Sequence, residues 1–206
     1  MIETLIVPES AYPYLVAQRG ALDDMKGDSE TWLRKYSDVL ADEYRVIARY
    51  LPPSCRSILD VGSGMGGLNV YLNEHFGGCC DVTLLDGVDD PPNVELHRKT
   101  FNHMQIARLF LGANGVEQVD FIDANDAHRR ATRTYDLIVS KQSWCFHYEP
   151  QRYLDLVLSA CHPRTKLIVD VRRQKPQWLG ELLEVFRHDA IIYDGVKTVT
   201  HGLSLK

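Results

Sequence analysis

The sequence has few cysteines, and none of them form a redox or zinc motif. There are five, an odd number, and two of them, Cys79 and Cys80, are adjacent. No two cysteines are separated by two residues, the spacing of many zinc and redox sites. Such a set is a poor framework for disulfide bonds, so we expect a reduced protein of the cytoplasm.

Long apolar runs and an excess of positive charge are also absent. No segment approaches the ~20 apolar residues that span a bilayer, and the first ten residues lack the basic start and apolar core of a secretory signal. The net charge is −5, whereas non-specific polyanion binders usually show a basic face. We therefore expect no membrane partner and disfavour nucleic acid as a partner. Two short basic clusters still allow a local patch: Arg129, Arg130 and Arg133, and Arg172, Arg173 and Lys175.

The sequence does contain an alternation of strand and helix patterns in a 206-residue chain, the length of one α/β domain. Residues 1–28 read as irregular, and 30–50 as an amphipathic helix ended by Pro52 and Pro53. Strands are expected at 57–61, 81–85, 118–122, 135–140 and 166–171, helices at 67–76, 94–111, 151–161 and 178–187, and a hairpin at 190–193 and 198–205. This order predicts a doubly wound, mostly parallel seven-stranded sheet that ends in an antiparallel hairpin.

The most informative segment is 58–66, I-L-D-V-G-S-G-M-G. An apolar strand ends at Asp60, and glycines come after it at Gly62, Gly64 and Gly66, with Ser63 between the first two. Glycine allows positive φ and close approach of the backbone to a ligand. The segment predicts a tight turn that presents backbone amides at a helix N-terminus. Its glycine spacing differs from the dinucleotide fingerprint G-x-G-x-x-G.

A second signal is the acid at the end of the next strand. Asp86 lies 20 residues beyond Gly66 and is followed by Gly87. A carboxylate at this place can accept two hydrogen bonds from a ribose diol. Asp89 and Asp90 make acids locally common, so a plain surface acid is the alternative interpretation.

Together these motifs resemble those of class I S-adenosylmethionine-dependent methyltransferases. The resemblance covers about residues 55–205 and implies S-adenosylmethionine as cofactor, with residues 55–206 as the catalytic domain. It also implies that residues 1–54, an irregular segment and a helix, cap the cofactor site, where Tyr36 is a candidate contact. The adenine would lie against Asp123 and Ala124, with Asp126 as a competitor. The cofactor residues expected are Asp60, Gly62, Ser63, Gly64, Gly66, Asp86, Gly87, Asp123, Ala124 and Ser140.

The fourth strand and the segment after it bear on the substrate. The motif [DN]-P-P-[YFW] of enzymes that methylate DNA bases is missing there; Asp90-Pro91-Pro92-Asn93 comes after the second strand and lacks the aromatic residue. Asp170 alone, or His147-Tyr148-Glu149, is too sparse for a metal site. We therefore expect no metal.

Segment 140–153, S-K-Q-S-W-C-F-H-Y-E-P-Q-R-Y, resembles a bacterial group described as sugar O-methyltransferases, whose pattern reads S-W-G-F-H-Y-P with a later D-[IV]-R. Here Cys145 replaces the glycine and Glu149 is inserted before the proline. The resemblance implies substrate contacts from Trp144, Tyr148 and Arg172. His147 is the candidate general base, with His128 a weaker rival. A packing histidine is the equally weighted alternative.

The function expected is methyl transfer to a hydroxyl of a small molecule such as a sugar. Alternatives are methylation of nucleic acid or protein, or a non-catalytic partner protein with the same fold. A homodimer is possible through the Cys79-Cys80 region or the terminal hairpin.

Overall fold

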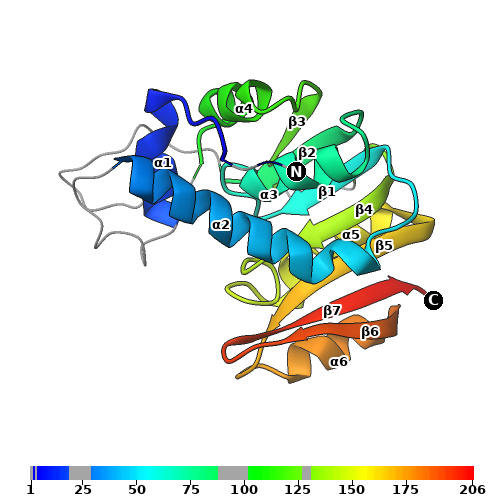
Figure 1. Ribbon diagram of the computed structural model, residues 1–206. Helices are drawn as coiled ribbons and strands as arrows, with labels where there is room; N and C mark the ends of the chain where they lie inside the picture. The colour runs from blue at the N-terminus through cyan, green and yellow to red at the C-terminus, as the bar shows by residue number, and fades with distance from the viewer. Residues whose placement is uncertain (1, 3, 19–28, 88–101, 127–130) are drawn as a thin grey trace.

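A seven-stranded sheet forms the centre of the protein (Figure 1). The computed structural model describes residues 2, 4–18, 29–87, 102–126 and 131–206. The strand order is β3-β2-β1-β4-β5-β7-β6, with the first five strands parallel and the last two antiparallel. The strands are β1 (Ser57–Val61), β2 (Asp81–Asp86), β3 (Val119–Asp123), β4 (Tyr135–Ser140), β5 (Cys161–Arg172), β6 (Phe186–Asp194) and β7 (Thr198–Leu205).

Helices cover both faces of the sheet, as right-handed crossovers between parallel strands require. One hydrophobic cluster joins the first four helices to one face, and a second joins the last two to the other. In Figure 1, α2 crosses in front of the sheet. The helices are α1 (Tyr12–Gln18), α2 (Ser29–Ile47), α3 (Gly67–His75), α4 (Met104–Ala113), α5 (Leu154–Ser159) and α6 (Gln177–Leu183), with 3₁₀ turns at Glu9–Ala11, Ala48–Tyr50, Ala124–Asp126 and Pro150–Arg152.

The side chains of β1 explain why a continuous apolar strand is needed here. Ile58 packs in the cluster under α2 and α3, whereas Leu59 and Val61 pack in the opposite cluster. Both faces of a central parallel strand are buried, so neither tolerates a solvated polar residue. Asp60 is the exception, because its polar side chain is buried on the side of α2 and α3, where it is only 5% exposed and is bonded to Asn69.

The fold confirms the predicted sheet and hairpin, and strands one and four have the predicted bounds. The prediction of an irregular N-terminus is wrong, because Glu9–Ala11 and α1 are helical. Pro13 occupies the first turn of α1, where a missing N–H costs nothing. Of the helix predicted at 94–111, the structure describes the second half as α4, which begins at Met104 and ends at Ala113. The first half falls among residues 88–101, which lie outside the described part.

Two helix ends were predicted too far along the chain. The helix expected at 151–161 is a 3₁₀ turn and then α5, and β5 already begins at Cys161. The helix expected at 178–187 ends at Leu183, because Phe186 pairs with Leu205 and is buried at the start of β6. Sheet pairing outweighs local helix propensity at both places.

No helix among the described residues combines the length and apolarity needed to cross a bilayer.

Candidate functional site

The glycine-rich turn between β1 and α3 has the backbone conformation that the sequence predicts. Gly62, Gly64 and Gly66 have φ of 74°, 54° and 76°, in the left-handed region that costs other residues about 1–2 kcal/mol. A Cβ on Gly62 would lie 1.7 Å from Ser143 Oγ. The absence of a side chain at Gly62 therefore allows the segment after β4 to pack against the turn.

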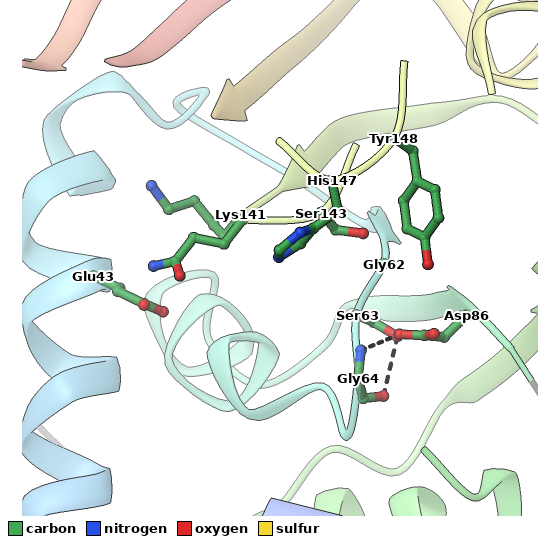
Figure 2. Close-up of a pocket in the computed structure, with 10 residues that line it drawn as sticks. Glu43, Gly62, Ser63, Gly64, Asp86, Lys141, Ser143, His147 and Tyr148 are labelled. Carbon is green, nitrogen blue, oxygen red and sulfur yellow. Dashed lines mark hydrogen bonds between the residues drawn. The ribbon is translucent and has the colours of Figure 1, made fainter. Parts of the chain in front are cut away.

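Asp86 meets this turn at the carboxyl edge of the sheet. Its Oδ2 accepts a hydrogen bond from Gly64 N at 2.5 Å (Figure 2). Its Oδ1 accepts one from Gly87 N at 2.7 Å. Asp86 pairs in register with Asp123 at the end of β3. Two motifs 22 residues apart in the chain are thus in direct contact.

Asp60 lies beneath the turn. Asn69 Nδ2 donates to Asp60 Oδ2 at 2.6 Å. Burial raises the pKa of the Asp60 carboxyl to about 7, the Asn69 hydrogen bond opposes the shift, and the charges of Asp86 and Glu43 add to it. The raised pKa is a consequence of removing a carboxylate from water. Asp60 borders a small cavity of about 50 Å³ that also touches Gly62.

A larger pocket of about 490 Å³ opens beside the turn, a volume within the usual range for small-molecule sites. Figure 2 shows Glu43 and Lys141 on one side of it, Asp86 and Tyr148 on the other, and His147 between them. Its lining residues come from α2, the glycine-rich turn, the end of β2 and the segment after β4: Glu43, Gly62, Ser63, Gly64, Asp86, Lys141, Gln142, Ser143, His147 and Tyr148.

The segment after β4 is held in an unusual conformation. Gln142 and Cys145 are the two non-glycine residues with positive φ in the described part of the chain, at 54° and 62°. Such residues persist only where the surroundings impose them, and they cluster at functional sites. Cys145 donates its N–H to Tyr148 O at 2.8 Å, and its carbonyl accepts from Arg172 N at 2.8 Å. Glycine would adopt the left-handed φ of Cys145 at less cost, because it lacks a Cβ.

A buried ion pair lies under this segment. Lys141 Nζ donates to Asp170 Oδ1 at 2.6 Å and to Thr200 Oγ1 at 3.1 Å. Asp170 also accepts from Thr200 Oγ1 at 2.6 Å and from Gln142 N at 3.2 Å. The side chain of Asp170 is 1% exposed and that of Lys141 13%. Strands β5 and β7 therefore fix one charged wall of the pocket.

Two residues predicted from the segment after β4, His147 and Tyr148, line the pocket together with the predicted Gly62, Ser63, Gly64 and Asp86. Desolvation lowers the pKa of His147, and the positive charge of Arg172 lowers it further. The imidazole ring lies 4.8 Å from the ring of Phe146 in an edge contact, and Tyr148 is 49% exposed. His147 thus keeps a neutral ring nitrogen near neutral pH, which is what a proton acceptor needs.

Other predicted residues lie away from the pocket. Trp144 is 0% exposed, and its Nε1 donates to Pro150 O at 2.8 Å, which corrects the prediction that it contacts a substrate. Ser140 is equally buried: its Oγ donates to Val61 O at 2.7 Å and accepts from Trp144 N at 3.0 Å. Its hydroxyl links two strand ends, so it holds the site together rather than lining it. Arg172 is not among the residues that line the pocket, and its guanidinium lies 5.5 Å from the Phe146 ring centroid.

The remaining predicted residues that the structure describes lie at the end of β3 and on α2. Asp123 Oδ1 accepts from Asn125 N at 2.8 Å, and Ala124 begins the 3₁₀ turn beyond it. Tyr36 is 1% exposed and stacks on Trp32 at 5.2 Å, so it packs in the core rather than against the large pocket. His128 lies outside the described residues.

Sequence reasoning missed Glu43, Lys141, Gln142 and Ser143. Glu43 belongs to the polar side of an amphipathic helix, where many acids look alike in sequence. For Lys141, the sequence offered one signal of a role in the site, which is its position directly after a buried strand. Among the described residues, no three His, Cys, Asp or Glu side chains gather as metal ligands.

No family model matches the sequence, and no curated protein matches it either. Solved structures do resemble it: an S-adenosylmethionine-dependent methyltransferase from Aquifex aeolicus is 16% identical, with 91% of this chain and 98% of that chain covered and a TM-score of 0.62. The ribosomal protein L11 methylase from Lactobacillus delbrueckii subsp. bulgaricus is 18% identical over 82% and 78% of the two chains, with a TM-score of 0.58.

The glycopeptide N-methyltransferase MtfA, solved with S-adenosyl-L-homocysteine, is 12% identical over 80% of this chain and 89% of that one, with a TM-score of 0.57. At these identities the likeness establishes the fold. The chain therefore has the Rossmann-like fold of the class I methyltransferases, as the order of its predicted elements, its motifs and its terminal hairpin implied.

Proposed function

We propose that this protein is an S-adenosylmethionine-dependent methyltransferase that acts on a hydroxyl of a small molecule such as a sugar. The contact between Asp86 and Gly64 carries the proposal, because it joins the acid and the glycine-rich turn beside a pocket of about 490 Å³. In open α/β sheets, ligands bind at this carboxyl edge. The similar folds of known methyltransferases support the same cofactor.

The pocket offers complementary groups to both ends of the cofactor. Asp86 would accept hydrogen bonds from the ribose diol, as a carboxylate at this strand end does in related folds. On the other side, Lys141 would face the carboxylate of the amino-acid part and Glu43 its ammonium group. The cofactor supplies an electrophilic methyl group, and the chain must orient the acceptor and remove its proton.

His147 is the proposed general base. It lines the pocket, and its lowered pKa leaves the imidazole neutral at pH 7. A neutral imidazole within hydrogen-bond reach of an acceptor hydroxyl can take its proton as the methyl group transfers. Tyr148, half exposed at the same rim, would contact the acceptor.

The contacts that Arg172 and Arg173 make with the rest of the protein favour a small acceptor over a macromolecule. Arg173 forms an ion pair with Asp194, and its Nε donates to Gly195 O at 2.9 Å. Arg172 is half-buried against Phe146. Arg173 is thus paired with an acid and Arg172 is partly buried, which supports a small acceptor over the broad basic face typical of nucleic-acid binding.

Calorimetric titration tests the cofactor. S-adenosylmethionine and S-adenosylhomocysteine should bind and NAD should not. Asp86→Asn should weaken binding by about 1–3 kcal/mol, the cost of losing charge-assisted hydrogen bonds. Asp81→Asn, at the other end of β2, is the matched control and should leave affinity unchanged. Failure of both cofactors to bind would favour a non-catalytic partner protein instead.

His147→Ala tests the base once an acceptor is known. Affinity for S-adenosylhomocysteine should stay near that of the wild type while turnover is lost. The wild-type rate should fall in acid with an apparent pKa below 6.5, because the pKa of His147 is lowered in the fold. Turnover retained by His147→Ala would remove His147 from this role.

A further inference from the structure

The turn after β5 carries three cations that differ in their surroundings. Arg173 is neutralised by Asp194. Arg172 and Lys175 instead lie over aromatic rings, with the guanidinium 5.5 Å from the Phe146 centroid and the ammonium 5.8 Å from the Trp178 centroid. Lys175 N donates to Arg172 O at 2.8 Å, so one tight turn positions both.

No carboxylate of the described residues lies within ion-pair distance of Arg172 or Lys175. Arg172 is nevertheless half-buried, and its backbone N–H is bound to Cys145 O. A guanidinium presents its N–H groups in a fork geometry that matches a carboxylate or phosphate. Because this fork is planar and pre-organised, little side-chain entropy is lost for each hydrogen bond to an anion.

The charge of Arg172 acts on the pocket. The Phe146 ring lies near both groups, with its centroid 5.5 Å from the Arg172 guanidinium and 4.8 Å from the centroid of the His147 ring. Arg172 is the neighbouring charge that lowers the pKa of His147. An anion bound by Arg172 would therefore lie near His147, which lines the pocket, whereas Arg172 itself is not among the lining residues.

We propose that the methyl acceptor carries an oxyanion, a carboxylate or a phosphate, and that Arg172 binds it, with Lys175 as a second cation. This inference rests on the proposed function. It makes Arg172 a specificity-determining residue that places the acceptor hydroxyl before His147. The acceptor class is then a hydroxylated small acid, such as a uronate or a sugar phosphate.

The test uses the full chain saturated with S-adenosylhomocysteine and three probes that share a sugar ring: glucose, glucuronate and glucose 6-phosphate. Binding is measured by ligand-observed NMR titration. Glucuronate or glucose 6-phosphate should bind more tightly than glucose, and the tighter of the two identifies the oxyanion. Arg172→Met, which keeps the apolar stem over Phe146, should weaken that binding at least about tenfold, the effect of losing one charge-assisted hydrogen bond.

Arg172→Lys should retain part of the affinity, since it keeps the charge and loses the fork. Arg187→Met, an exposed arginine on β6, should leave it unchanged. Equal binding of the three probes, or an anion affinity unaffected by Arg172→Met, would overturn the inference alone, provided S-adenosylhomocysteine binds. If S-adenosylhomocysteine itself does not bind, the proposed function fails as well.

Discussion

Removing one partner of the Lys141–Asp170 pair should cost much more than removing both. The two charged atoms are 2.6 Å apart, and at an effective dielectric constant of about 20 Coulomb's law gives an attraction of roughly 6 kcal/mol. Desolvation of both groups cancels a large part of this. Breaking a buried pair by removing one partner nevertheless costs about 3–5 kcal/mol, because the other charge remains buried.

The exposures predict which partner matters more. Lys141→Met leaves the carboxylate of Asp170 1% exposed, with Thr200 and Gln142 N as its remaining donors. Asp170→Asn leaves an ammonium that borders the pocket and can turn towards water. We expect a loss of about 3–4 kcal/mol in the free energy of unfolding for Lys141→Met, a smaller loss for Asp170→Asn, and about 1 kcal/mol for the double variant.

Urea unfolding followed by circular dichroism measures these differences as a double-mutant cycle. The matched control is the Lys166–Asp189 pair at 2.8 Å, whose side chains are 39% and 22% exposed, and which should couple by less than about 1 kcal/mol. Additive losses at Lys141 and Asp170, or a larger loss for Asp170→Asn, would refute this reasoning.

The same variants separate stability from binding. The double variant should recover stability but still bind S-adenosylhomocysteine weakly, because the cation proposed to face its carboxylate is gone. Binding of 5′-methylthioadenosine, which lacks the amino-acid part, should be unchanged. Equal weakening of both ligands would remove Lys141 from the proposed cofactor contact.

Other substitutions test individual positions. Gly62→Ala should lower the free energy of unfolding by about 2–4 kcal/mol and abolish cofactor binding, since the φ of Gly62 is 74° and the new Cβ would overlap Ser143. The control is Gly112→Ala in α4, where nothing lies within 4 Å of the added Cβ. This variant should be neutral or slightly stabilising in the same urea assay. Burial, with the charge of His188 second, lowers the pKa of His201 to about 4 from 6.5. The unfolded chain therefore binds the extra proton first, and His201 contributes a fall of up to about 3 kcal/mol in unfolding free energy from pH 6.5 to pH 4, opposed by the raised pKa of Asp60 over the same range. His201→Gln should remove this contribution, so the variant should lose less stability in acid than the wild type, and an identical pH dependence would contradict the assignment. Cys145→Gly should be about 0.5–1 kcal/mol more stable than Cys145→Ala, because only glycine relieves the φ of 62°; the reverse order would mean that this backbone stores no strain.

Local pattern was sufficient for the parts of the site that lie at strand ends. A buried strand followed by Gly62, Gly64 and Gly66 requires a tight turn, since few other residues adopt those φ values. Asp86 ends the neighbouring parallel strand, and parallel strands end at one edge of the sheet. The contact between Asp86 and Gly64 was therefore predictable from residues 58–86 alone.

The direction of side chains after β4 was not predictable, because it depends on contacts between distant segments. Trp144 was expected in the pocket, but it lies in the core. Its indole N–H donates to the carbonyl of Pro150, and the backbone turns through a left-handed φ at the next residue, Cys145. Ser143 faces the pocket instead, in the space that Gly62 leaves.

The sheet, the glycine-rich turn and the acid opposite it are encoded locally, because periodicity and backbone sterics act over a few residues. The charges that form the walls of the pocket are instead brought together by the packing of the whole chain. Lys141 meets Asp170 and Thr200 across three strands, and Glu43 arrives on α2. Their placement depends on contacts between segments as distant in the chain as Glu43 and Lys141, which no local pattern encodes.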